Sequence, residues 1–350
     1  MGKKPMPRDN TMRTAFLFPG QGAQAVGMGK DLYEAFAAAK FLFDRAEKVC
    51  GLPLKRVCFE GPEEELNRTD IAQPAIFTVS AVMLACLDSL LEPAKVEALR
   101  PAFMAGLSLG EYTALYAADM IDFDDALKLV TRRGAAMQAA ATTVPSGMVA
   151  VMGLDEPKAR ELCAAAAQGQ VLTCANFNCP GQIVISGQID ACKRAEGLAK
   201  DFGAIGATPL KVAGAFHSDI MAPAADKLSQ ALADVKFRLA KGLPPSADRT
   251  ALPDPTWGQA FAAVSTQVVA NVDAQPYCCE ESVSPKLLAQ LTGAVRWQQS
   301  VELLLSQGVE KFYEIGPGRV LAGFMRRINR KAEVVNVNSR ESLEKLVAAV

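Results

Sequence analysis

Residues 106–110 have the sequence G-L-S-L-G, and this G-x-S-x-G pattern constrains the fold more than any other segment of the chain. The pattern is typical of a serine on a tight turn between a buried strand and a helix, because small residues on both sides let the hydroxyl project from the sheet. The flanks fit, since residues 102–105 are apolar like a short buried strand and residues 109–118 have helical spacing. We therefore predict that Ser108 is a nucleophile at a strand end. The alternative is a plain strand-turn-helix corner without chemistry.

The chain contains one histidine, His217. An imidazole with an ordinary pKa near 6.5 can accept a serine proton at neutral pH. A serine nucleophile in this chain can therefore use His217 as its histidine base, or none. The alternative is a histidine that only satisfies hydrogen bonds inside the core.

Composition excludes several classes of function. A formal net charge of −1 gives no overall field for nucleic acid or a membrane surface, so we expect neither as a partner. The most apolar stretch, residues 71–87, is interrupted by Gln73 and Pro74 and is too short to span a bilayer. The nine cysteines form no C-x-x-C pair, so we expect free thiols and no metal or redox cofactor. Free thiols are typical of a reducing compartment, and we expect a cytoplasmic location, or a plastid or mitochondrial one if the source is eukaryotic.

Strand-like and helical segments alternate along the first part of the chain. The pattern predicts strands at 14–18 and 102–105 and helices at 34–49, 75–91 and 124–142. Such alternation is typical of an α/β fold with a largely parallel sheet. A chain of 350 residues is also longer than one core usually supports, which favours two domains.

The pattern changes at residue 147, where a β-α-β-β-α-β order follows over about seventy residues and predicts an inserted ferredoxin-like α+β unit. We expect a small domain of residues 141–213 within a discontinuous large domain of residues 14–140 and 214–340. Residues 1–13 are expected to form a flexible tail. Residues 239–262 carry four prolines and predict a long surface excursion.

Six motifs then follow one another along the chain: F-P-G-Q-G-A-Q at 18–24, G-L-S-L-G-E-Y at 106–112, R-R-G at 132–134 with Met137, G-A-F-H-S at 214–218, Gln290 ahead of V-R-W at 295–297, and E-I-G-P-G at 314–318. In this order they resemble the malonyl-CoA:acyl-carrier-protein transacylases over residues 14–330. The resemblance implies a hydrolase-like parallel-sheet domain with an inserted ferredoxin-like domain. The chain departs from the family at Leu107, where many members have histidine, and in its longer 239–262 segment.

The resemblance implies acyl transfer through a malonyl-serine, with Ser108 as nucleophile and His217 as base. It also implies that a main-chain carbonyl at Gln290 orients the imidazole, where a serine protease would use a buried acid. An ordinary glutamine at a helix end is the alternative. For the oxyanion, the N–H of Leu109 at the helix start is the natural first donor, and the resemblance gives the N–H of Gln21 as the second. The glycines around Gln21 could instead form a plain loop, and their spacing fits no phosphate-binding motif.

Four further residues are assigned by the resemblance. Arg133 would bind the malonyl carboxylate through paired hydrogen bonds that an acetyl group cannot accept, although a solvated helix face is the alternative. Phe216 would fill the space that a methyl branch on the substrate needs. Arg326 and Arg327 lie in a run of positive charge at residues 319–331 that could steer an acidic carrier protein, or could be an ordinary solvated face.

The sequence thus predicts an acyltransferase, a monomer, that moves malonyl from malonyl-CoA to the phosphopantetheine thiol of acyl carrier protein in fatty acid synthesis. One alternative is a discrete acyltransferase that serves a polyketide or polyunsaturated-fatty-acid synthase. A serine esterase or thioesterase, which would release free malonate as fast as CoA, is another. A catalytically silent docking protein is the last.

Overall fold

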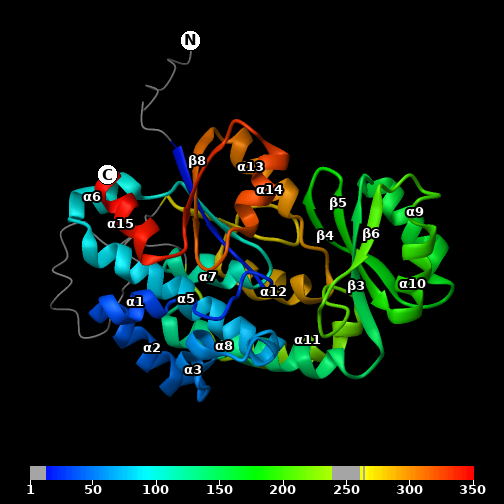
Figure 1. Cartoon of the computed structure of the whole chain (residues 1–350), viewed down its shortest axis with the longest axis horizontal. Coiled ribbons are helices and arrows are strands. Elements are labelled where there is room, and N and C mark those ends of the chain that lie inside the picture. Colours follow the sequence, from blue (N-terminus) through cyan, green and yellow to red (C-terminus); the bar gives the residue numbers. More distant parts are fainter. Residues whose placement is uncertain (1–12, 239–260, 263–264) are drawn as a thin grey trace, which may run out of the picture.

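A computed structural model describes residues 13–238, 261–262 and 265–350. The expected tail at 1–13 and the proline-rich segment at 239–262 lie almost wholly outside these ranges. Two sheets organise the described residues, one in a large unit and one in a smaller unit beside it (Figure 1).

The strands that form these sheets are β1 (Arg13–Phe18), β2 (Phe103–Gly106), β3 (Ser146–Met152), β4 (Leu172–Cys179), β5 (Gln182–Gln188), β6 (Gly206–Pro209), β7 (Gln267–Val269), β8 (Val309–Ile315) and β9 (Glu333–Val337). The helices before the small sheet are α1 (Lys30–Ala35), α2 (Ala37–Cys50), α3 (Leu54–Glu60), α4 (Glu63–Leu66), α5 (Thr69–Leu90), α6 (Pro93–Leu99), α7 (Leu109–Ala117) and α8 (Phe123–Ala141). The later helices are α9 (Glu156–Ala167), α10 (Ile189–Leu198), η1 (Asp219–Met221), α11 (Ala222–Ala233), η2 (Glu280–Ser282), α12 (Val283–Thr292), α13 (Trp297–Ser306), α14 (Val320–Ile328) and α15 (Arg340–Ala349).

The large sheet has the order β7-β2-β1-β8-β9, and every neighbouring pair is parallel. Side chains of β1 alternate between its two faces. Phe16 and Phe18 join the core formed with α5 and α7, whereas Ala15 and Leu17 join the core formed with α13 and α14 (Figure 1). Both faces are therefore covered by helices, which confirms the predicted α/β class with a parallel sheet.

The small sheet is antiparallel and has the order β4-β5-β3-β6. Its elements follow one another as β3, α9, β4, β5, α10 and β6, which is the predicted β-α-β-β-α-β order. Helices α9 and α10 pack on the sheet and enclose a separate apolar core. The small unit is inserted between α8 and η1 of the large unit, so the chain leaves the large unit after α8 and re-enters it before η1.

Two helix predictions were wrong in their bounds. The helix expected at 34–49 is two helices, because Phe36 is extended (φ −120°, ψ 132°) between α1 and α2. The helix expected at 75–91 begins six residues earlier, at Thr69, and continues through Gln73 and Pro74. Proline removes a single hydrogen-bond donor from a helix, and burial of nearly all of α5 offsets that loss.

Helix α5 also corrects the expectation that the apolar stretch is too short to cross a bilayer. Its 22 residues have the length and apolar composition of a membrane span, and the most apolar 18-residue segment within it has a mean hydropathy of 1.6. However, 94% of that apolar segment is buried inside the protein. Helix α5 packs against α8, α2 and α7, and is therefore the central helix of the large core.

Candidate active site

Ser108 lies between β2 and α7 in a strained backbone conformation, with φ 53° and ψ −102°. Glycine is required on both sides of it. A Cβ on Gly106 would lie 1.9 Å from the carbonyl carbon of Gly110, and a Cβ on Gly110 would lie 2.1 Å from the carbonyl oxygen of Phe18. Asn271 braces the turn, because its Oδ1 accepts from the Ser108 N–H at 2.6 Å and its Nδ2 donates to the Gly106 carbonyl at 2.7 Å. The turn thus holds the serine hydroxyl at the end of the sheet.

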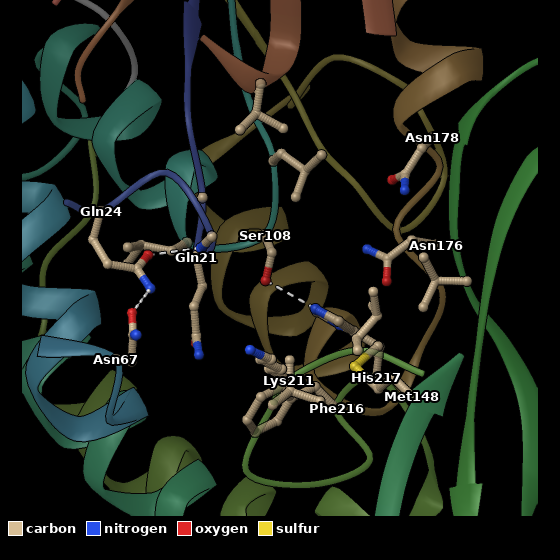
Figure 2. A pocket seen from close by; sticks show the side chains of 18 of the residues that line it. Gln21, Gln24, Asn67, Ser108, Met148, Asn176, Asn178, Lys211, Phe216 and His217 are labelled. Atoms are coloured by element: carbon tan, nitrogen blue, oxygen red, sulfur yellow. Dashed lines mark hydrogen bonds between the residues drawn. The ribbon is translucent and has the colours of Figure 1, made fainter. Parts of the chain in front are cut away.

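His217 follows the small sheet and reaches Ser108 across the cleft (Figure 2). Its Nε2 lies 2.8 Å from Ser108 Oγ, and its Nδ1 lies 2.8 Å from the main-chain carbonyl of Gln290. A carbonyl accepts only, so Nδ1 carries a proton and Nε2 of the neutral ring is free to accept one. Burial and the positive charge of Arg133 lower the pKa of His217 to about 4, although its bond to the Gln290 carbonyl raises that pKa. The imidazole is therefore neutral and ready to act as a base at neutral pH.

Gln290, on α12, connects several site residues through its side chain as well as its carbonyl. Its Nε2 donates to the carbonyl of Ser108 at 3.0 Å and to Oε2 of Glu111 at 2.6 Å. Its Oε1 accepts from Nη2 of Arg133 at 2.8 Å. Because both ends of the amide are used, its orientation is fixed by its partners.

Arg133, on α8, is only 1% exposed, so the alternative of a solvated arginine does not hold. Its Nη1 donates to Oε1 of Gln73 at 2.7 Å, and its Nη2 also approaches Ser108 Oγ at 3.1 Å. The guanidinium lies over the Tyr112 ring, 5.2 Å from its centroid. Its Nε has no hydrogen-bond partner among the described residues. A buried cation with an unused donor beside the serine suits a substrate that brings a negative charge.

Leu109 and Gln21 border the same space. Leu109 is the first residue of α7, where N–H groups lack partners within the helix. Gln21 lies in the loop after β1, and its side chain donates to Thr69 Oγ1 at 3.2 Å. Both residues line the cleft with Ser108, so their amides are the nearest candidates for oxyanion donors.

The cleft between the two units has a volume of about 430 Å³. Phe216 lines it beside His217, and its apolar wall includes Met137, Met148 and Val184. The polar residues of its wall include Gln24, Asn67, Asn176, Asn178 and Lys211 (Figure 2). Across residues 13–238, 261–262 and 265–350, no three potential metal-ligating side chains lie close enough to hold a metal ion.

The two predicted docking residues differ in their surroundings. Arg326 is exposed on α14. Arg327 instead binds the turn between β4 and β5, where it donates to Gln182 Oε1 at 2.8 Å and to the Pro180 carbonyl at 3.0 Å. Arg327 therefore connects the large unit to the small one.

Three residues that the sequence motifs did not identify also contact the site: Glu111, Asn271 and Gln73. Gln73 interrupts an apolar run in the sequence, and in the structure it accepts a hydrogen bond from Arg133. Glu111 stands inside the 106–112 motif on an otherwise apolar helix, which was the available signal. Asn271 follows the short apolar strand β7, a position where polar residues often serve a site.

A nucleophile, a neutral imidazole and the candidate amides of Leu109 and Gln21 at one cleft define a site for acyl transfer through serine. The chain belongs to the acyl transferase domain family, whose model matches residues 15–252. Within that family its relatives are malonyl CoA-acyl carrier protein transacylases. The relative from Bacillus subtilis (strain 168) is 39% identical over 335 residues, 95% of each chain. The relative from Escherichia coli (strain K12) is 39% identical over 314 residues, 90% of this chain and 92% of the relative.

Solved structures that are similar to this chain are also malonyl transferases. An acyl carrier protein S-malonyltransferase from Vibrio cholerae O1 biovar eltor is 40% identical, with a TM-score of 0.83 over 95% of this chain and 99% of that one. A malonyl-transacylase solved in complex with a type II PKS acyl-carrier protein is 36% identical, with a TM-score of 0.85 over 97% of this chain and all of that one (100%). The predicted family is thus confirmed, and the chain is an acyltransferase.

Proposed function

We propose that this chain transfers a malonyl group from malonyl-CoA to the phosphopantetheine thiol of an acyl carrier protein, in fatty acid synthesis. One observation carries the choice of malonyl: the buried Arg133 guanidinium lies 3.1 Å from Ser108 Oγ. A short acyl group on that serine would have its far end at the guanidinium. A free carboxylate there would be paired with the cation, whereas an acetyl group would leave the cation without an anionic partner.

In the first half-reaction, Ser108 Oγ attacks the thioester carbonyl as its proton moves to His217 Nε2. The N–H groups of Leu109 and Gln21 stabilise the oxyanion of the tetrahedral intermediate. When the intermediate collapses, the carbon–sulfur bond breaks, and the departing CoA sulfur takes the proton from His217. Malonyl-serine and free CoA remain.

In the second half-reaction, the carrier thiol enters the site that CoA has left. His217 takes the proton of the thiol as its sulfur attacks the serine ester. Collapse of the second intermediate returns the proton to Ser108 Oγ and leaves malonyl on the carrier. The Gln290 carbonyl holds Nδ1–H throughout, so the same nitrogen, Nε2, serves both steps.

Arg133→Ala tests the choice of acyl group. We expect it to lower the rate of Ser108 malonylation at least a hundredfold, because the malonyl carboxylate loses its buried partner. This corresponds to a loss of about 3 kcal/mol or more of transition-state stabilisation. Acetylation of Ser108 should fall much less. The measurement is mass spectrometry of the protein during competition between malonyl-CoA and acetyl-CoA.

Arg132→Ala is the matched control for that experiment. Arg132 is the adjacent arginine on the same helix, but its side chain is 58% exposed and only pairs with Asp234 at 3.5 Å. We expect the control to keep both rates. Equal losses for the two acyl groups in Arg133→Ala would show that Arg133 supports the fold and does not recognise the substrate.

Carrier docking is tested with Arg326→Glu. The positive residues near the cleft would attract an acidic carrier, so charge reversal at this exposed position should raise the KM for the carrier several-fold, more at low salt. Transfer to the carrier should slow more than formation of malonyl-serine. A KM that does not change at any salt concentration would remove Arg326 from the docking surface.

A polyketide synthase carrier is the second candidate acceptor, because a structural neighbour was solved with a type II PKS acyl-carrier protein. The chemistry at Ser108 is the same for both acceptors. Side-by-side transfer rates to carriers of the two kinds would distinguish them. The monomeric state and the cytoplasmic location stay predictions.

A further inference from the structure

Glu111 is a buried carboxylate in the first turn of α7 that has no place in the mechanism above. It is fully buried, with 0% of its surface exposed. Its oxygens accept hydrogen bonds from the hydroxyl of Tyr277, from Gln290 Nε2 at 2.6 Å and from the Asn271 N–H at 3.1 Å. Burying a charge is costly, and three donors aimed at one carboxylate offset that cost.

The amide of Gln290 joins this carboxylate to Arg133. One end of the amide donates to Glu111 and the other accepts from the guanidinium at 2.8 Å. An anion and a cation thus lie buried on either side of one neutral group. Electrostatic attraction between them is strong enough to act on the ionisation of both.

The other groups around Glu111 are neutral or are paired with another charge. Tyr112, on the same helix, and Tyr277 both have pKa values raised by burial, so both are neutral at physiological pH. Helix α12 contributes Lys286, which lies over the Tyr277 ring, 5.2 Å from its centroid, and is paired with Asp273 at 2.9 Å. Helix α5 contributes Gln73, a neutral residue whose side chain contacts Arg133. His217 lies beyond Gln290 and is neutral above about pH 4.

We propose that Glu111 is a specificity-determining residue that acts through Arg133: its negative charge offsets the guanidinium in the empty site and weakens the hold of Arg133 on the substrate carboxylate. This inference rests on the proposed function. When malonyl enters, the site holds two anions for one cation, and the two anions repel each other. A unit charge about 10 Å away, at an effective dielectric constant of about 20, changes binding by about tenfold.

Weaker binding of the malonyl carboxylate by Arg133 would favour a two-step transfer. The malonyl group must first be accepted by Ser108 and then given up to a second thiol. Binding energy that stabilises the malonyl-enzyme as much as the transition state does not speed its release. Glu111 would therefore keep malonyl recognition without making the intermediate too stable.

Protonation of Glu111 would remove the opposing charge. Burial raises the pKa of Glu111 to about 7, although its three hydrogen bonds and Arg133 lower it. Below that pH the carboxyl is neutral and Arg133 should hold malonyl more strongly. Above it the carboxylate is charged and the hold should weaken.

The experiment measures the ratio of malonyl to acetyl transfer onto Ser108 in the whole protein, between about pH 5.5 and 9. His217 is the base for both acyl groups, so its ionisation cancels in the ratio, and the malonyl carboxylate stays ionised over this range. We expect the ratio to fall about tenfold as the pH rises through about 7. A wild-type ratio that stays constant with pH would overturn the proposal.

Two substitutions sharpen the test. Glu111→Gln keeps the shape and can still accept from Gln290 and Asn271, so the ratio should stay at the high, low-pH value throughout. Tyr277→Phe removes one bond that lowers the pKa of Glu111, so the fall in the ratio should move to higher pH. If Glu111→Gln does not fold, the proposal is still tested by the pH dependence of the ratio in the wild-type protein and by its shift in Tyr277→Phe. A ratio in Glu111→Gln that keeps the wild-type pH dependence would overturn the proposal.

Glu314→Gln is the matched control. Glu314 is also fully buried, but its carboxylate accepts from the N–H groups of Leu321 and Ala322 at the start of α14. Its replacement should lower stability and leave the pH dependence of the ratio in place. Failure of the proposed function would look different, because Arg133→Ala would then leave the ratio unchanged in any background.

Discussion

Ser108→Ala is expected to abolish the single malonyl adduct that malonyl-CoA alone leaves on the wild-type protein. The reason is that Ser108 Oγ is the hydroxyl placed 2.8 Å from the base and held there by a strained turn. Transfer to the carrier should fall by about 10⁴-fold or more, as when a nucleophile is removed from a group of residues that act as a unit. The measurement is intact-protein mass spectrometry followed by peptide mapping.

Ser218→Ala is the control for that variant. Ser218 is buried next to His217, but its hydroxyl donates to the Ala215 carbonyl at 2.7 Å. The control should keep the adduct on Ser108. An adduct that persists in Ser108→Ala, or that maps to a thiol such as Cys174 or the exposed Cys278, would refute the nucleophile assignment.

His217→Ala should lower the rate of Ser108 acylation by about 10²- to 10⁴-fold, the usual contribution of a general base. It should also remove the acid limb of the pH profile. Only the neutral imidazole accepts a proton, so the wild-type kcat/KM for acylation should fall as the pH drops through about 4, the lowered pKa of His217. The measurement is the rate of adduct formation without carrier, in short incubations.

Acid also acts on the fold, and the two effects must be separated. The pKa of His217 is below its ordinary value near 6.5, so the contribution of His217 to stability falls as the pH drops from about 6.5 to about 4. Glu111, whose pKa is raised to about 7, contributes in the opposite direction. Circular dichroism at each pH would show that the enzyme stays folded during the incubation. Retention of the same acid limb in His217→Ala would mean that another group is the base.

Local patterns predicted the parts of this protein that depend on neighbouring residues. The G-x-S-x-G pattern requires a tight turn, and a Cβ on Gly106 would have its closest contact with Gly110, within the same pattern. The order of the small unit follows from period-2 and helical spacing in consecutive segments. His217 could be assigned because the chain offers no other imidazole.

Contacts between distant segments were not predictable in the same way. Glu111, Gln290 and Asn271 come from α7, α12 and the end of β7, and the pattern of each segment says nothing about the others. Pro74 predicted a helix boundary by its local chemistry, but burial of α5 in the tertiary structure outweighed it. The run of positive charge predicted Arg327 as a docking residue, and that run contains no sign of its hydrogen bond to the turn after β4.

The bridging position of the one imidazole makes the protein its own spectroscopic probe. Histidine labelled with ¹⁵N or ¹³C would place a single ring in the NMR spectrum, without assignment experiments, provided that purification avoids a polyhistidine tag. Because its two nitrogens face Ser108 Oγ and the Gln290 carbonyl, their chemical shifts would report acylation at one side and movement of α12 at the other. Inhibitor binding and turnover could thus be followed in real time on one resonance pair.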